Sequence, residues 1–112
     1  MVACVNSPES VTFSGDVDDL DEVVARLEAD GKFARKLNVP LAYHSYHMLR
    51  MADAYAEKLR QIVPPKPTWS GDVTYASPVT GGLIASPDKL IAEHYVANLT
   101  SPVLFAQAFE AM

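Results

Sequence analysis

The amino-acid sequence predicts an α+β fold, in the order strand, strand, helix, strand, helix, followed by strand, helix, helix. Two observations support this prediction. The spacing of apolar residues changes repeatedly between the period of two of a strand and the 3.6 of a helix, and prolines and glycines separate the segments. The chain has 112 residues, of which 49% are hydrophobic and 21% charged, which is typical of a single folded domain rather than a disordered segment.

The chain begins with a predicted β-hairpin. Residues 2–5 and 10–14 are rich in β-branched residues, and the sequence "NSPE" lies between them. Asn6 and Ser7 can bond their own backbone, and Pro8 fixes its φ angle, so this stretch favours a turn.

An amphipathic helix and a third strand are expected next. The helix has clustered acids in its first turn, which favour a helix start, and Gly31 is placed to end it. From residue 33 apolar residues occupy alternate positions, which predicts a strand over 33–41, and Pro40 indicates an edge strand or a strand end. The helix face comprises Val17, Leu20, Val23, Val24 and Leu27, and the strand face Phe33, Leu37, Val39 and Leu41.

A second amphipathic helix is predicted from about Ser45, where the serine can cap it. The "PPKP" sequence at 64–67 cannot form regular helix or central strand and predicts a stiff linker. Core packing explains the apolar stripe of this helix, including its methionines. The stripe comprises Met48, Met51, Ala52, Tyr55, Leu59 and Ile62.

Beyond the linker the sequence predicts a strand, a turn and two helices. Ser86-Pro87 and Ser101-Pro102 each place a capping residue before a proline at the first helical position. We expect the strand at 73–77, the turn at 80–82 and the helices near 87–97 and 102–112.

Residues 1–62 form the part with the clearest sheet and helix pattern. A split βαβ sheet normally has four strands and two covering helices, so one strand and one helix would be lacking before residue 1. The chain also starts directly with a strand and stops in an apolar helix. We therefore expect it to be a segment of a larger protein.

Charge and composition exclude several classes of function. The formal net charge of −5 leaves no basic surface for a nucleic acid, and no apolar run approaches the roughly 20 residues that span a bilayer. Cys4 is the single cysteine, so no internal disulfide can form, and no signal peptide is evident. These features favour a reducing, cytoplasmic location without nucleic-acid or membrane partners.

The stretch "PLAYHSYHM" at 40–48 contains two of the three histidines. A metal site is disfavoured, because His44 and His47 lack the i, i+4 spacing of a zinc pair and no carboxylate lies near them. Two interpretations remain open from the residues alone. The stretch can be a polar corner in which Ser45 caps a helix, or a histidine at a strand end can act as a general base.

Several segments together resemble the acyltransferase domain of type I polyketide synthases, most closely the iterative reducing enzymes of fungi. They are "VACVNSPESVTFSGD", "KFARKLNVPLAYHSYHM", "YASPVTGG" and "HYVANLTSPVLFAQAFEAM". The resemblance implies that residues 1–62 are a ferredoxin-like small subdomain, incomplete at its amino end, with its exit helix. Residues 63–112 would be a linker and the strand-helix-helix return into an α/β-hydrolase-like large subdomain.

The resemblance also implies a chemistry. In that family a GHSxG serine takes malonyl from malonyl-CoA and passes it to the thiol of an acyl carrier protein, with a histidine as base and acid. That histidine ends a four-residue motif, here Leu41-Ala42-Tyr43-His44. His44 is thereby assigned the catalytic role, the three preceding residues substrate binding, and Asn98 a backbone carbonyl that orients the histidine.

Some family features are not found in the sequence. None of the glycines precedes a His-Ser pair, so GHSxG does not occur, and the chain alone is predicted to be inactive. The tetrad has Tyr43 where malonyl-selective domains have phenylalanine, and Leu41 replaces their first histidine. His94 stands where the family usually has tyrosine and is expected to be a partly buried helix residue. No bound cofactor is expected, and the partners implied are the carrier protein and the rest of the synthase.

A non-catalytic alternative is an isolated ferredoxin-like module that docks a carrier protein. Either way, the last predicted helix carries apolar residues that would lie exposed and promote self-association. They are Val103, Leu104, Phe105 and Phe109.

Overall fold

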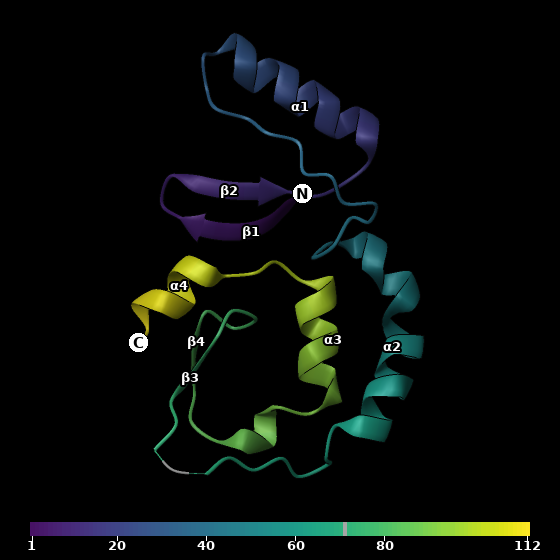
Figure 1. The fold of residues 1–112 in the computed structure, drawn as a ribbon, viewed down its shortest axis with the longest axis vertical. Helices are drawn as coiled ribbons and strands as arrows, with labels where there is room; N and C mark the ends of the chain where they lie inside the picture. Colours follow the sequence, from purple (N-terminus) through teal and green to yellow (C-terminus); the bar gives the residue numbers. More distant parts are fainter. Residues whose placement is uncertain (71) are drawn as a thin grey trace.

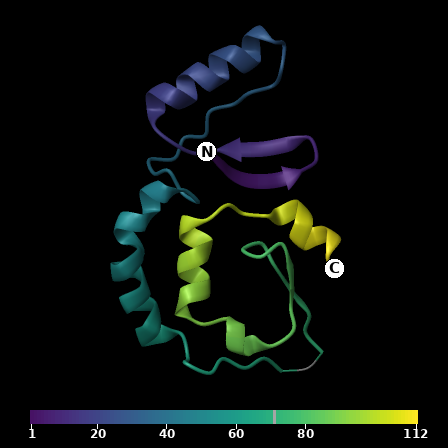
Figure 2. The ribbon, with the colours of Figure 1, turned by 180° about the vertical axis from the view of Figure 1, so that it is seen from behind.

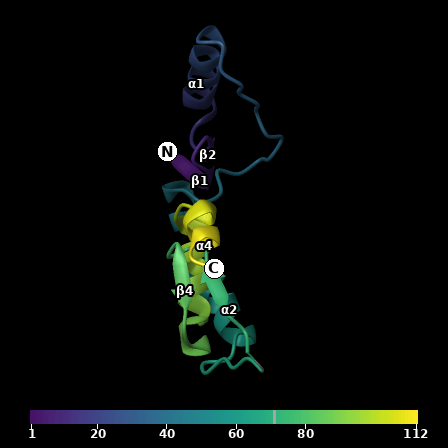
Figure 3. The ribbon, with the colours of Figure 1, turned by 90° about the vertical axis from the view of Figure 1, so that its left-hand side faces the viewer.

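A computed structural model describes residues 1–70 and 72–112 of the chain (Figure 1). Gly71, within the predicted linker and return segment, lies outside the described residues. The molecule is a flat plate of 50 × 32 × 17 Å with a radius of gyration of 16.5 Å, against about 13 Å for a compact domain of this length. The edge-on view in Figure 3 shows the elements arranged nearly in one layer. A plate this thin can bury few side chains.

The first hairpin confirms the prediction. Strand β1 (Val2–Ser7) pairs antiparallel with β2 (Ser10–Phe13), and the hydroxyl of Ser7 accepts a hydrogen bond from the Glu9 amide at 3.3 Å across the turn. The other edge of β1 is bridged by Val103, whose amide donates to Ala3 and whose carbonyl accepts from Val5, both at 2.8 Å. The hairpin is thereby joined to the carboxy-terminal part of the chain.

Helix α1 (Val17–Ala29) is also confirmed, and it ends before Gly31, which adopts a left-handed φ of 67°. No residue of this helix is buried. Arg26 pairs with Glu22 within the helix, and Asp21 pairs with Lys36 of the segment that follows. The helix is formed as the sequence predicts, but its apolar stripe is only half-buried, at Leu20, Val23, Val24 and Leu27.

The strand predicted over 33–41 is wrong for this chain. Residues 32–39 are irregular and take part in neither hairpin, and Phe33 is 90% exposed. A strand exists only where a neighbouring backbone pairs with it, because its N–H and C=O groups have no partners within the segment. The apolar alternation is present, but none of the described residues supplies the neighbouring strand.

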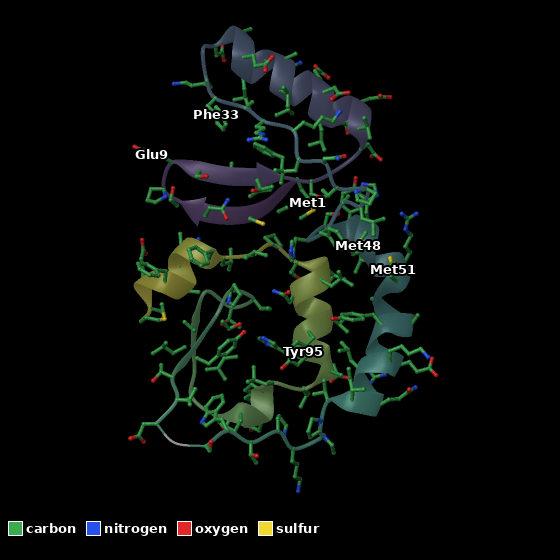
Figure 4. The ribbon with its side chains drawn as sticks, viewed as in Figure 1. Met1, Glu9, Phe33, Met48, Met51 and Tyr95 are labelled. Carbon is green, nitrogen blue, oxygen red and sulfur yellow. The ribbon has the colours of Figure 1, made fainter. Side chains whose placement is uncertain are left out.

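The second helix begins with a short 3-10 turn, η1 (Tyr46–Met48), and continues as α2 (Leu49–Ile62). Ser45 caps the turn as predicted. Met48 is 1% exposed, whereas Met51 is 44% exposed, and Figure 4 labels both at the start of this helix. Core packing therefore explains Met48 and does not explain Met51.

Helix α2 lies beside α3 (Ala92–Thr100), as Figure 2 shows from behind. Arg60 of α2 donates two hydrogen bonds, at 2.7 and 3.1 Å, to one carboxylate oxygen of Glu93 on α3. The small core is spread over η1, this helix pair, β1 and the carboxy-terminal part of the chain. The buried apolar residues are Ala3, Met48, Ala56, Leu59, Ile84, Ala92 and Ala108.

The return segment differs from the prediction in three places. A second hairpin forms from β3 (Tyr75–Ser77) and β4 (Gly82–Ile84), of which only β3 was predicted. Proline 87 starts only the short turn η2 (Pro87–Lys89), so α3 begins later than expected. The last helix, α4 (Phe105–Glu110), begins after the bridge to β1, because residue 103 is already paired as a strand.

The turn between β3 and β4 requires a glycine. Gly81 has a φ of 69°, and a Cβ atom there would lie 3.0 Å from the Cβ of Gln107 and 3.3 Å from Leu104 Cδ1. Both the backbone conformation and the close approach of α4 and its N-cap residue exclude a side chain.

An exposed aromatic pair lies on α4. Phe105 and Phe109 are 53% and 63% exposed, and their rings stack at 6.2 Å. They border an apolar groove of about 300 Å³ with Tyr75, Ala76, Pro78, Ala108 and Met112.

We expect the chain to associate at increasing concentration in sedimentation-velocity experiments, because this groove exposes apolar area to water.

Phe109→Glu should lower the association constant about tenfold or more, since it places a charge in the groove. Leu49→Glu is the matched control, because Leu49 is 60% exposed on α2 and does not line the groove. A clean monomer for the unsubstituted chain, or equal effects of the two substitutions, would contradict this prediction.

Candidate functional site

His44 lies in the loop before η1, against the carboxy-terminal end of α3. Its backbone amide donates to the carbonyl of Leu99 at 3.0 Å, and its ring Nδ1 lies 2.7 Å from the carbonyl oxygen of Asn98. The last carbonyls of a helix have no partners within the helix. Two of these free acceptors therefore fix both the backbone and the ring of one histidine.

The contact with Asn98 determines the tautomer of His44. A carbonyl oxygen can only accept a hydrogen bond, so Nδ1 must carry the proton. In the neutral ring this leaves Nε2 with a lone pair. The lone pair of the half-buried imidazole therefore lies on the nitrogen that makes no contact with Asn98, an arrangement that a general base requires.

The backbone at His44 is unusual. Its φ of 57° is the one left-handed value among the described residues other than glycine. Histidine tolerates this region better than most residues, but the conformation is uncommon and concentrates at functional sites. The hydrogen bond from its amide to Leu99 stabilises a turn that points the ring toward α3.

Ser45 fixes the same loop from the other side. Its hydroxyl donates to the carbonyl of Ala42 at 2.6 Å and accepts from the amide of His47 at 3.3 Å, and the residue is fully buried. The polar-corner interpretation and the general-base interpretation are thus compatible. Ser45 closes the corner, and the corner orients His44.

The other tetrad residues lie apart from the histidine ring contacts. Leu41 and Ala42 line a hollow of about 170 Å³ at the start of α1, together with Gly15, Asp16, Val17, Pro40, His47 and Arg50. Tyr43 is 42% exposed, and its ring centre lies 6.5 Å from that of His44. The structure brings His44 and Asn98 together, while Leu41 and Ala42 line a hollow that does not include His44.

His47 occupies a different environment from His44. Its ring stacks on Tyr46 at 4.4 Å, and its buried Nε2 has no hydrogen-bond partner among the described residues, with Asp16 Oδ1 3.7 Å away. Among residues 1–70 and 72–112 no three His, Cys, Asp or Glu side chains gather as a metal site would require. Nor is any helix of the described chain long and apolar enough to cross a membrane.

The third histidine lies on α3, one turn before Asn98. His94 is half-buried, as the sequence predicted, between Tyr75 and Tyr95, whose ring centres lie 6.1 and 5.5 Å away. Burial lowers the pKa of His94. Burial raises the pKa of Tyr75, and the nearby phenol of Tyr95 raises it further. The neutral imidazole is therefore the form that the folded chain prefers.

The free energy of unfolding should accordingly fall as the pH drops below about 6.5. The unfolded chain then binds a proton at His94 more readily than the folded chain, so acid favours unfolding. We expect His94→Gln to flatten the change in urea midpoint between about pH 7.5 and 5.5. This range lies above the titration of Glu93, whose pKa the Arg60 hydrogen bonds lower. An equal pH dependence in both proteins would contradict the assignment.

Sequence reasoning missed one part of the site. The carbonyl of Leu99 and the left-handed backbone of His44 are main-chain features, and no residue type in "NLTSPV" signals them. Burial raises the pKa of the Cys4 thiol, which disfavours the reactive thiolate.

Comparison with known proteins identifies the family. The profile described as "Acyl transferase domain" matches residues 1–112. This chain therefore belongs to the acyl transferase domain family. The acyl transferase segment is 49% identical over 116 residues to the highly reducing polyketide synthase pks5 of Leptosphaeria maculans and 47% identical to Preu1 of Preussia isomera. Both matches cover the whole segment.

Solved structures agree with the sequence comparison. The acyl transferase segment superposes on the acyltransferase domain from module 8 of the salinomycin polyketide synthase with a TM-score of 0.86 and 34% identity. It also superposes on that of an iterative synthase in enediyne biosynthesis, with a TM-score of 0.75 and 34% identity. Each match covers 98% of the segment but only 25% and 28% of the solved chains. The segment spans 4% and 5% of the pks5 and Preu1 proteins.

Proposed function

We propose that this segment supplies the histidine half of a Ser-His acyltransferase that loads a malonyl extender unit onto an acyl carrier protein within a polyketide synthase. The observation that carries the proposal is the 2.7 Å contact between His44 Nδ1 and the Asn98 carbonyl. It leaves Nε2 as the basic atom of the ring. The backbone amide and Nδ1 of His44 are both held by carbonyls of α3.

The proposed reaction has two transfers. In the first, His44 Nε2 removes the proton from a serine hydroxyl outside this segment as its oxygen attacks the thioester carbonyl of malonyl-CoA. The carbon–sulfur bond breaks, and the imidazolium returns its proton to the coenzyme A thiolate. In the second, Nε2 takes the proton of the carrier protein's phosphopantetheine thiol, which attacks the malonyl-serine ester, and the serine oxygen regains the proton.

The tetrad would contribute to substrate binding. We assign Leu41, Ala42 and Tyr43 to the wall that faces the extender unit, because they are the three residues of the tetrad that precede His44. The aromatic residue at 43 favours malonyl over a branched unit. Asn98 acts through its carbonyl oxygen, so its side chain is not part of the proposed chemistry.

The decisive experiment restores the nucleophile. No GHSxG serine occurs in the 112 residues, so we expect the segment alone to transfer no labelled malonyl to a carrier protein. Joining it to an upstream acyltransferase segment that carries GHSxG should establish transfer from malonyl-CoA. Carrier-protein binding without malonyl transfer in either form would instead support a docking module.

A further inference from the structure

His47 lies three residues after His44, and one atom of its ring lacks a hydrogen-bond partner. The Nε2 atom is buried and forms no hydrogen bond within the described part of the chain. Buried polar groups without a partner are rare in folded proteins, because they lose their bonds to water and gain nothing in return. The ring is otherwise well packed, since it stacks on Tyr46 with the ring centres 4.4 Å apart. Packing alone therefore does not account for a histidine at this position.

An acceptor for this nitrogen lies at the start of α1. Oδ1 of Asp16 is 3.7 Å from His47 Nε2, so a movement of about 1 Å would form a hydrogen bond. Asp16 is the N-cap residue of α1, where an aspartate usually accepts from an amide of the first turn. Its side chain forms no such bond here. A buried donor and a carboxylate that does not cap its own helix thus lie within reach of each other.

The carboxylate also determines where His47 carries its proton. Without a proton on Nε2, the lone pair of this atom would lie next to those of the carboxylate, whereas an N–H group there is attracted to the negative charge. We therefore expect His47 to hold a proton on Nε2. His44 has the opposite arrangement, because its Nδ1 lies against the Asn98 carbonyl. The two histidines of one turn thus differ in the nitrogen that is protonated.

Hydrogen bonds connect His47 to the backbone on both sides of His44. The amide of His47 donates to the hydroxyl of Ser45 at 3.3 Å, and that hydroxyl donates to the carbonyl of Ala42 at 2.6 Å. His44 lies inside this turn with a φ of 57°, a conformation that persists only where the surrounding structure holds it. Helix α3 holds the His44 end of the turn. A bond from His47 to Asp16 would hold the other end.

We propose that His47 is a positioning residue of the acyltransferase. Its Nε2–H donates to the Asp16 carboxylate and so fixes residues 42–47 against the start of α1. With both ends of the turn held, the His44 ring keeps Nδ1 on the Asn98 carbonyl and the lone pair on Nε2. His47 itself contacts neither substrate nor reacting atoms. The expected effect on catalysis rests on the proposed function, whereas the effect on the His44 ring is measurable without catalysis.

Arg50 provides a control for simple charge effects. It is the other charged side chain that lines the hollow shared by Asp16 and His47, and it forms no ion pair with Asp16 in the described structure. If any nearby positive charge held the turn, Arg50→Met would have the same effect as a substitution of His47. The proposal instead requires a directed N–H donor at His47.

The His44 ring is the first measurement. In the 112-residue chain with ¹⁵N-labelled histidine, the two ring nitrogens of His44 should have widely separated chemical shifts, because one tautomer is fixed. His47→Phe keeps an aromatic ring on Tyr46 but removes the donor, so this separation should shrink as the two tautomers exchange. His47→Gln retains an N–H group near the position of Nε2 and should keep the separation, as should Arg50→Met.

Asp16→Ala removes the acceptor and should reduce the separation as His47→Phe does. This side chain is 66% exposed, so its truncation leaves the fold intact and decides the test even if His47→Phe unfolds the chain. Unchanged His44 shifts in Asp16→Ala, or an equal change in Arg50→Met, would overturn the proposal.

Transfer of malonyl is the second measurement, made after the segment is joined to an upstream segment with GHSxG. We expect His47→Phe and Asp16→Ala each to lower the single-turnover rate about tenfold, because a misplaced base slows the chemical step. The KM for malonyl-CoA should change by about twofold or less, and His47→Gln should retain transfer within about threefold. The double variant should lose no more than the larger single loss, since both remove one bond.

The two measurements separate this proposal from the proposed function. Unchanged transfer in both His47→Phe and Asp16→Ala would overturn the positioning role and leave the role of His44 intact. If the joined protein transfers no malonyl in any form, the proposed function fails, and the His44 shifts alone decide whether His47 and Asp16 hold the turn.

Discussion

We expect His44→Ala to lower malonyl transfer by roughly 10²–10⁴-fold in an acyltransferase that carries both the serine and this segment, because a general base contributes on that scale. Without the imidazole no group removes the serine proton or returns it to the leaving thiolate. The measurement is single-turnover transfer of labelled malonyl from coenzyme A to carrier protein. His44→Gln should lose as much, since glutamine can reach the Asn98 carbonyl but has no basic nitrogen.

Asn98→Ala is the matched control for this prediction. It retains the backbone carbonyl that accepts from His44 Nδ1 and should leave transfer close to that of the unsubstituted protein. A loss with Asn98→Ala as large as that with His44→Ala would contradict a role through the main chain. Full activity of His44→Ala would contradict the catalytic assignment itself.

Met48→Ala is the substitution that we expect to destabilise the fold most. Met48 is 1% exposed in η1, and truncation of a large buried side chain costs about 2–5 kcal/mol through lost burial and the cavity left behind. That is a large share of the roughly 5–15 kcal/mol that holds a small domain folded. Urea unfolding followed by circular dichroism gives the free energy of unfolding.

Met51→Ala provides the comparison three residues further along the same helix. Because Met51 is 44% exposed, its truncation should cost well below the Met48 value, on the order of 1 kcal/mol or less. Similar costs at the two positions would show that the packing at the start of α2 is not what determines stability. The Met48 variant should also lose order at Ser45 and His44, which precede it in the same turn.

Local structure was largely predictable from the sequence. The first hairpin, α1 with Gly31 at its end, and the Ser45 cap depend on turn residues, periodicity and short-range hydrogen bonds, all of which lie within a few residues of each other. The same reasoning failed over 33–41 because the alternation shows that a strand is possible, while only a neighbouring backbone makes it form.

The bounds of the two carboxy-terminal helices also depended on contacts that the local sequence does not reveal. The sequence predicted helices near 87–97 and 102–112, whereas α3 begins at Ala92 and α4 at Phe105. The serine-proline pairs indicated that helices follow, but Pro87 begins only η2, and the residues that precede α3 and α4 are Ile91 and Leu104 rather than the predicted serines. The pairing of Val103 with β1, which delays α4, joins residues about a hundred positions apart and leaves no local signal.

For the site, the sequence by itself determined the residue types: a tetrad that ends in His44, a serine after it and an "NLTSPV" segment near the carboxy-terminus. The tertiary structure decided their geometry. It turned the His44 backbone to a φ of 57° and brought it to the free carbonyls of Asn98 and Leu99. Those acceptors are main-chain atoms that any residue carries, so only the folded position of α3 could select them.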